Sequence, residues 1–243
     1  MDRRVMIEVC VGDVESAIAA EVGGADRIEL CDNLAVGGTT PSAGTIAEVC
    51  RWLSIPVHVL IRPRGGDFVY SERELAVMQH DIEAARSLGA AGVVFGVLTA
   101  DGTVDCNLTM ALIEGARPLG VTFHRAIDQI REPLEAVDTL VGLGVARVLT
   151  SGGCATALEG ASMIARLIEH ARDRITVVAG GRIGSDNLEA IVRLTQVSEV
   201  HIGSAVCRAM ATPMLGSGNR SEDSWHRTDA QRVAAIVSLI GNL

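Results

Sequence analysis

The pattern that decides the fold of this chain is clearest in Val57-His58-Val59-Leu60-Ile61-Arg62-Pro63-Arg64-Gly65-Gly66-Asp67-Phe68. Residues 57–62 have the alternation of a β-strand, and the proline and glycines that follow are typical of a loop whose shape is set locally. Arg62 and Arg64 are suited to hold an anion there, because guanidinium groups bind carboxylates and phosphates in bidentate fashion. Whether Arg62 binds a ligand or forms a structural ion pair stays open at this point.

Similar units of strand and helix recur along the whole chain. The predicted strands are residues 5–10, 27–31, 57–62, 92–97, 121–124, 147–151, 175–180 and 199–203. The predicted helices are residues 14–22, 46–52, 72–88, 108–116, 134–143, 157–171, 188–194 and 229–240. This order predicts an α/β fold, a single-domain (β/α)8 TIM barrel over residues 1–243. A Gly/Ser-rich stretch at about 212–224 is predicted to be a loop, acting as a lid or as part of a subunit contact.

Composition excludes several classes of function. The net charge is −9 and there is no basic run, which argues against nucleic acid and anionic membranes as partners. No apolar run approaches the ~20 residues of a spanning helix, so we expect a soluble, cytoplasmic protein. The six cysteines form no CxxC pair, which predicts reduced thiols. All 21 basic residues are arginine, so pyridoxal phosphate and lysine Schiff-base chemistry are excluded.

The phase of each strand separates an apolar face from a polar one. One phase is apolar and is predicted to pack under the helices, whereas the other must point into the barrel and is unusually polar. The inward set is Met6, Glu8, Cys10, Arg27, Glu29, Cys31, His58, Leu60, Arg62, Thr122, His124, Glu199 and His201. Arg27, His58 and Glu199 lie near strand starts and are predicted to form a structural layer of ion pairs. Active sites of this fold lie at the opposite end.

Three acid–base candidates lie near that end of the strands. Glu8 and Glu29 occupy matching places on neighbouring strands, and His124 is predicted to lie across the mouth. They could act as general acid and base, or could hold a divalent metal. The alternative is a salt-bridge network of the glutamates with Arg62 and Arg125.

Cys10 and Cys31 each follow one of these glutamates by two residues, in the same inward phase. Two thiolates on adjacent strands suit Cu(I), which prefers sulfur ligands. The alternative is that they are small core side chains.

Anion binding is predicted where glycine-rich segments follow the last three predicted strands, residues 147–151, 175–180 and 199–203. Barrels often bind phosphate there through backbone N–H groups. The candidate anion-binding residues at the mouth are Arg62, Arg64, Arg125, Ser151, Gly152, Gly181, Arg182 and His201.

Taken together, the motifs resemble the CutC family of copper homeostasis proteins in order and spacing. They are residues 8–10, 23–31, 37–42, 61–68, 122–126 and 149–153. The resemblance implies a cytoplasmic barrel that assembles as a homodimer or larger homo-oligomer and is linked by name to copper tolerance. It also implies that Cys10 and Cys31 match the family cysteines proposed as Cu(I) ligands.

Three hypotheses follow for the function. The first is a copper-handling protein that binds Cu(I) at Cys10 and Cys31. The second is an enzyme for a small phosphorylated or carboxylated metabolite, with Arg62 and Arg64 holding the anion and Glu8, Glu29 and His124 moving protons. The third is a structural protein, which requires an unbroken inward salt-bridge network without an open cavity.

Overall fold

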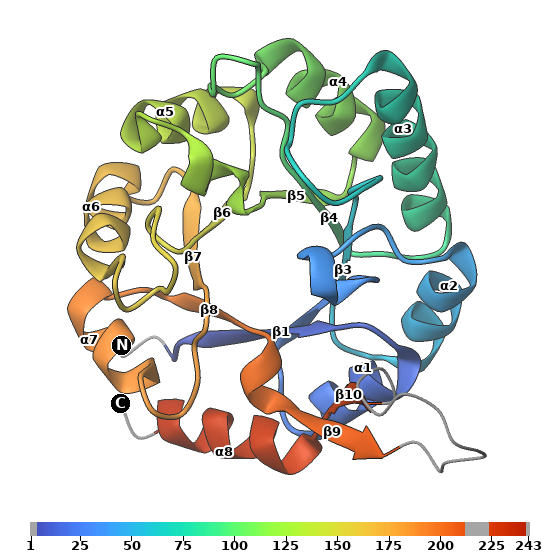
Figure 1. The fold of residues 1–243 in the computed structure, drawn as a ribbon, viewed down its shortest axis with the longest axis vertical. Coiled ribbons are helices and arrows are strands. Elements are labelled where there is room, and N and C mark those ends of the chain that lie inside the picture. The colour runs from blue at the N-terminus through green and yellow to red at the C-terminus, as the bar shows by residue number, and fades with distance from the viewer. Residues whose placement is uncertain (1–3, 212–223, 242–243) are drawn as a thin grey trace.

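The chain folds as a closed barrel of eight parallel strands inside a ring of helices (Figure 1), in a computed structural model that describes residues 4–211 and 224–241. The strands are β1 Met6–Val11, β2 Arg27–Leu30, β3 Val57–Leu60, β4 Gly92–Phe95, β5 Gly120–Phe123, β6 Arg147–Thr150, β7 Thr176–Gly180 and β8 Glu199–Ile202. The helices are α1 Val14–Val22, α2 Ala43–Trp52, α3 Glu72–Ser87, α4 Cys106–Ala116, α5 Pro133–Leu143, α6 Ala161–Ala171, α7 Leu188–Thr195 and α8 Ala230–Ile240. The predicted (β/α)8 barrel is confirmed.

The main differences from the predictions are at α6 and in the segment after β8. Helix α6 begins at Ala161, later than predicted, because Thr156 and Glu159 each accept a hydrogen bond from the other's backbone N–H and close a separate turn first. Strand β9, Cys207–Ala211, pairs antiparallel with β10, Ser224–Thr228, where no strands were predicted. Of the predicted loop at about 212–224, all but Ser224 lies outside the described residues.

The start of α3 fixes the loop that follows β3. Ser71 Oγ accepts a hydrogen bond from the Glu74 backbone N–H, and Glu74 Oε2 accepts one from the Ser71 N–H at 2.8 Å. The two hydrogen bonds form a capping box, for which the spacing of Ser71 and Glu74 is typical. Glu74 also accepts a hydrogen bond from Arg64 Nε. The cap and the arginine-rich loop are therefore held to each other.

The barrel wall buries different residues on its two faces. The outward side chains, among them Ile7, Val9 and Ile28, are fully buried under the helices and belong to the large apolar core. Burial of each such side chain stabilises the fold by roughly 1.5–3 kcal/mol. Inside the barrel, the buried apolar cluster is much smaller and consists of Cys10, Cys31, Leu60 and Val94. The interior is therefore largely left to polar groups.

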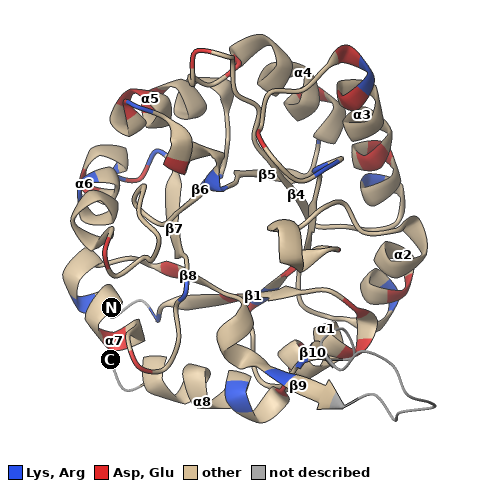
Figure 2. Ribbon diagram, in the orientation of Figure 1, with Lys and Arg blue, Asp and Glu red and all other residues tan. Residues whose placement is uncertain are grey.

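Charged residues are found on the strands as well as on the outer helices (Figure 2). Within residues 4–211 and 224–241, no helix combines the length and apolarity that crossing a membrane requires. Assembly into a homodimer or larger oligomer stays a prediction.

Candidate functional site

Ion pairs form a layer in the half of the barrel interior near the N-terminal ends of the strands, here called the lower layer. Arg27 donates from Nε to Glu8 Oε2 at 2.5 Å and from Nη2 to Glu199 Oε2 at 2.7 Å. Arg147 Nε lies 3.3 Å from the same Glu199 oxygen. His58 lies 4.0 Å from Glu8, and burial lowers its pKa to about 4, so the imidazole is neutral. The predicted structural layer is present, with Glu8 as a further member.

The strand register places Glu8 in this layer, whereas we predicted that it lies level with Glu29. Glu8 is opposite Arg27 on β2 and His201 on β8, and Cys10 is opposite Glu29. Closing a barrel staggers neighbouring strands, so equal places in two strands do not lie at equal heights. Burial alone would raise the pKa of Glu8, but the hydrogen bond from His201 and the charge of Arg27 hold it well below its usual range.

The two predicted thiols lie side by side above this layer. The Sγ atoms of Cys10 and Cys31 are 3.6 Å apart, and Cys31 Sγ is 3.3 Å from Glu29 Oε2. The hydrogen bond with Cys31 lowers the pKa of Cys10 to about 5, against the effect of burial. The same bond and burial raise the pKa of Cys31 well above its usual value. At neutral pH the pair therefore carries one thiolate.

Glu29 and His201 lie beneath the thiols. His201 Nε2 is 3.7 Å from Glu29 Oε2, and its Nδ1 is 2.7 Å from Glu8 Oε1. Burial raises the pKa of Glu29 to about 8. Burial acts to lower the pKa of His201, but Glu29, Cys10 and Glu8 together raise it well above its usual value. His201 is therefore an imidazolium at neutral pH and lies between the carboxyl groups of Glu8 and Glu29.

Two groups of side chains here could hold a metal ion. One is Cys10, Glu29 and Cys31, and the other is Glu8, Glu29 and His201; in each, one ligand atom per residue lies within 4.8 Å of the others. The first group contains sulfur and suits Cu(I), whereas the second suits a divalent cation.

Arg62 lies at the mouth and forms no ion pair with any acid in the described part of the chain. Its Nη1 donates to the carbonyls of Val36 and Gly38 at 3.0 and 2.9 Å, and its Nη2 donates to the Gly66 carbonyl at 2.8 Å. The Nε–H is buried and has no hydrogen-bond partner among the residues that the structure describes. The alternative of a salt bridge between Arg62 and the glutamates is therefore contradicted, because Arg62 holds the loop through carbonyl groups.

His124 presents a second buried donor. Its Nδ1 accepts a hydrogen bond from the Ala126 backbone N–H at 3.2 Å, and its ring centroid is 4.7 Å from that of Phe68. Burial, with the charge of Arg62, lowers the pKa of His124 to about 3. The neutral ring therefore carries its proton on Nε2, which is buried without a partner. Such a group is better suited to donate a hydrogen bond than to shuttle protons at neutral pH.

Arg125 is paired with an acid that we did not predict. Its Nε donates to Asp128 Oδ2 at 2.8 Å and its Nη2 donates to Ser151 Oγ at 2.7 Å. The alternative of a salt bridge between Arg125 and the glutamates is therefore contradicted. The i,i+3 spacing of Arg125 and Asp128 is a usual one for helical ion pairs and could have indicated this contact.

The same Asp128 occupies the glycine-rich exit that was predicted to bind phosphate. Its Oδ1 accepts hydrogen bonds from the backbone N–H groups of Ser151 and Gly153, each at 3.1 Å, and from Thr150 Oγ1 at 2.5 Å. The Gly152 N–H donates to Thr150 Oγ1 at 2.8 Å. These amides therefore already have acceptors within the chain.

One cavity of about 220 Å³ at the mouth collects seven of the predicted site residues. They are Cys10, Glu29, Cys31, Arg62, His124, Arg125 and His201. The remaining lining residues, which we did not predict as site residues, are Leu34, Gly37, Leu60, Phe68 and Leu149. This cavity contradicts the hypothesis of a purely structural interior.

The other predicted site residues do not line this cavity. They are Glu8, Arg64, Ser151, Gly152, Gly181 and Arg182. Arg64 is held by Glu74 and Asp67 and is partly exposed. Gly181 has φ +119°, and a Cβ there would lie 2.9 Å from that of Ser151, so close approach and backbone angle both require glycine. Arg182 is exposed, and its role in anion binding stays a prediction.

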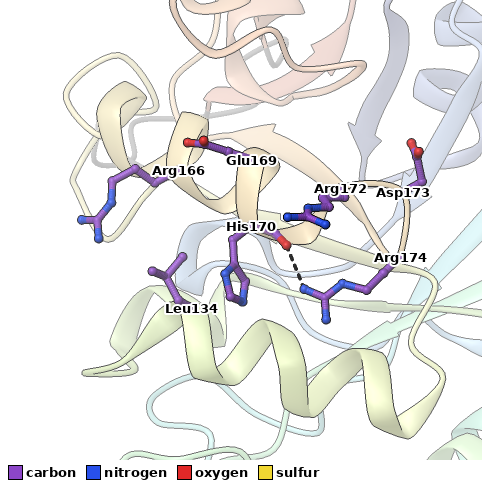
Figure 3. A pocket seen from close by; sticks show the side chains of 7 residues that line it. All are labelled: Leu134, Arg166, Glu169, His170, Arg172, Asp173 and Arg174. Atoms are coloured by element: carbon purple, nitrogen blue, oxygen red, sulfur yellow. Dashed lines mark hydrogen bonds between the residues drawn. The ribbon is translucent and has the colours of Figure 1, made fainter.

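A larger hollow of about 760 Å³ lies outside the barrel, where α6 leads into β7 (Figure 3). Three of its seven lining residues are arginines, but Arg174 and His170 both contact Asp138, at 2.8 and 2.9 Å. The turn before β7 lies at the N-terminal end of the barrel strands. Residues at that end usually stabilise the fold and do not take part in catalysis. We therefore place the candidate site at the mouth.

The fold and the site define a (β/α)8-barrel protein with a thiol pair and two unpaired buried donors at its mouth. Residues 5–206 match the model of the CutC family. The chain belongs to this family.

Named relatives agree with this membership. The chain is 47% identical to the human copper homeostasis protein cutC homolog, over 98% of this chain and 90% of that protein. It is 44% identical to the family protein CutC of Chromobacterium violaceum, over 95% of this chain and 96% of that protein. The CutC structure from Streptococcus agalactiae superposes with a TM-score of 0.79 at 36% identity, covering 82% of this chain and 98% of that one.

More distant structures share the fold alone. N-(5'-phosphoribosyl)anthranilate isomerase from Pyrococcus furiosus covers 98% of this chain and 100% of its own, with a TM-score of 0.59 at 16% identity. At this identity the likeness extends to the barrel and not to the chemistry.

Proposed function

We propose that this protein handles copper and binds Cu(I) through Cys10 and Cys31. The observation that carries the proposal is the 3.6 Å separation of the two sulfur atoms in the lining of the mouth cavity. Soft thiolate ligands select Cu(I), and the thiolate of Cys10 is already formed at neutral pH. The names of the human and mouse relatives, copper homeostasis protein cutC homolog, support this assignment.

Copper(I) is favoured over a divalent cation by the state of the other ligand group. Glu8 in that group already accepts a hydrogen bond from Arg27 Nε and lies 2.7 Å from His201 Nδ1. A divalent ion would have to displace these contacts. Glu29 Oε2 lies 3.3 Å from Cys31 Sγ and could serve as a third ligand to a copper ion bound by the two thiols.

Competition of the reduced protein with a chromogenic Cu(I) chelator, without oxygen, tests this proposal. We expect one Cu(I) per chain in the wild type. In the double variant Cys10→Ser/Cys31→Ser the affinity should fall by about 100-fold or more, because loss of even a supporting residue of a metal site costs about 10–100-fold. Cys106→Ser removes an exposed cysteine outside the cavity and is the matched control. Equal affinity of the wild type and the double variant would reject the proposal.

A second candidate function is catalysis on a small anionic metabolite. It is favoured by Arg62, whose buried charge lacks an acidic partner in the described residues. An unpaired buried charge is costly, and an anionic ligand would neutralise it. Glu29 would serve as the general acid, because burial keeps it protonated at neutral pH.

Thermal denaturation in the presence of a library of phosphorylated and carboxylated metabolites tests the second candidate. We expect some of them to raise the melting temperature of the wild type and not that of Arg62→Met. A broad library without any stabilising anion argues against this function and leaves the copper proposal untouched.

A further inference from the structure

Arg62 and His124 share two properties that set them apart in the mouth. Their side chains are nine-tenths buried or more, with exposed fractions of 5% and 6%. Each has one buried N–H without a hydrogen-bond partner, Nε of Arg62 and Nε2 of His124. Among the described residues that have an unpaired buried polar atom, only these two line the mouth cavity. An unpaired buried donor is unfavourable, so a ligand in the cavity is a source of the missing acceptors.

The ring of Phe68 brings the two donors into one part of the cavity. The Arg62 guanidinium carbon is 5.0 Å from the centroid of this ring, and the His124 ring centroid is 4.7 Å from it. All three residues line the cavity. The two donors therefore flank the same aromatic side chain.

The charge of the site calls for a single negative charge on the ligand. Arg62 has no ion-pair partner within residues 4–211 and 224–241, and the nearby Tyr70 hydroxyl is neutral. His124 contributes a hydrogen bond but no charge. The other two basic residues in the lining already have acidic partners, Arg125 in Asp128 and His201 in Glu8.

The donor set suits a carboxylate better than a phosphate. A phosphate has more acceptor atoms than two N–H groups satisfy, and barrels bind it through backbone amides of glycine-rich exits. At the exit after β6 those amides donate to Asp128 and Thr150. A carboxylate has two oxygens, one for each donor.

The size and lining of the cavity limit the rest of the ligand. A volume of about 220 Å³ corresponds to roughly seven water molecules at ~30 Å³ each, so the ligand has few heavy atoms. Leu34, Leu60, Phe68 and Leu149 provide apolar surface. A short hydrocarbon segment attached to the carboxylate fits such a lining.

We propose that the mouth binds a small monocarboxylate, with one carboxylate oxygen on Arg62 Nε and the other on His124 Nε2. This inference rests on the second candidate function and specifies its ligand class. The short apolar part of the ligand packs on Phe68 and Leu60, beside the thiol pair.

Ligand-observed and protein-observed NMR with three matched probes tests the proposal. The probes are butyrate, its neutral counterpart butyramide, and propyl phosphate. We expect butyrate to bind about 10-fold more tightly than the other two, because a charge-assisted hydrogen bond contributes about 1.5–3 kcal/mol. On the wild type, butyrate should also shift the ¹⁵N resonance of His124 Nε2, a readout that needs no variant.

Variants at the two donors sharpen the test. Arg62→Met and His124→Leu should each weaken butyrate binding by about 10-fold or more. His124→Gln keeps an N–H near the position of Nε2 and should bind within about threefold of the wild type. A cooperative thermal unfolding transition, like that of the wild type, establishes that each variant is folded.

The outcomes separate this proposal from the function on which it rests. Tighter, Arg62-dependent binding of propyl phosphate overturns the carboxylate assignment but supports an anionic substrate. Binding of neither anion, or butyrate binding that Arg62→Met does not change, overturns the monocarboxylate site, whereas the metabolite library decides the function on which it rests. An unshifted His124 resonance on butyrate binding overturns the two-donor site.

Discussion

Arg27 and Arg62 are both almost completely buried in the same barrel, and their surroundings differ. Arg27, in the lower layer, contacts two glutamates at 2.5 and 2.7 Å. Arg62, at the mouth, donates only to carbonyl groups and keeps an unpaired Nε–H. The two have the same residue type and the same inward phase, so burial and polarity do not tell them apart. Their partners do: Arg27 is paired with two glutamates in the lower layer, whereas Arg62 has no acidic partner in the described residues and lines the mouth cavity.

Removal of Arg27 should have the largest effect on stability. Arg27→Met leaves Glu8 and Glu199 buried without their shared partner, and breaking a buried pair in this way costs about 3–5 kcal/mol. The measurement is the free energy of unfolding from urea denaturation.

The matched variant is Arg62→Met. It removes hydrogen bonds to three carbonyls but also an unpaired buried charge, so its cost should be smaller, about 1–3 kcal/mol. If Arg62→Met destabilises the protein as much as Arg27→Met does, the distinction between the two regions is wrong.

An effect of intermediate size is expected in the pH dependence of the unfolding free energy, because the pKa of His124 is lowered in the folded state. Burial lowers its pKa in the folded state to about 3, from an ordinary value of 6.5, so between these values the unfolded state binds more protons. The stabilising contribution is therefore complete above pH 6.5 and is lost as the pH falls toward 3, by up to about 1.4 kcal/mol per pH unit.

His124→Gln removes this titration, and the difference between variant and wild type isolates it from the other titrating groups. We expect the difference in unfolding free energy to change between pH 6.5 and 4.5 and to stay constant above pH 7.5. His58→Gln, in the lower layer, is the comparison, because burial lowers the pKa of His58 to about 4 and predicts the same sign. A difference that is independent of pH for His124→Gln would show that folding does not shift the pKa of His124.

Much of the fold could be predicted because it depends on local patterns. The period of two along each strand, the capping box at Ser71 and the glycine-rich exits are all visible in the sequence. The sequence also indicated that Cys10 and Cys31 come together, because both lie in the inward phase of strands that follow each other.

The heights and partners of the polar residues could not be predicted in the same way. Glu8 lies below Glu29 because of the stagger that barrel closure imposes, a property of all eight strands together. Asp128 occupies the glycine-rich exit after β6 because the short helix after β5 directs it there, across strands. Partners of this kind depend on tertiary structure, which the period of a single strand does not report.

Substitution at the thiol pair should have the smallest effect on stability. It should instead change the reactivity of the Cys10 thiol. The hydrogen bond with Cys31 is the largest cause of the lowered pKa of Cys10, about 5. The rate of alkylation of Cys10 by iodoacetamide, followed by peptide mass spectrometry, should therefore stay constant from pH 8 down to about pH 6, whereas an ordinary thiol with a pKa of about 8.5 loses reactivity over this range.

Cys31→Ala removes that hydrogen bond and should move the midpoint of Cys10 alkylation upward by one pH unit or more, on the order of the shift that a single strong hydrogen bond causes. The variant should remain folded, because a buried cysteine packs as a small apolar side chain. An unchanged midpoint would assign the low pKa to His201 instead, since its charge also acts on Cys10. In the lower layer the equivalent removal of one partner costs stability, whereas at the mouth it should change chemistry, and that difference is the property expected of a site that binds a ligand.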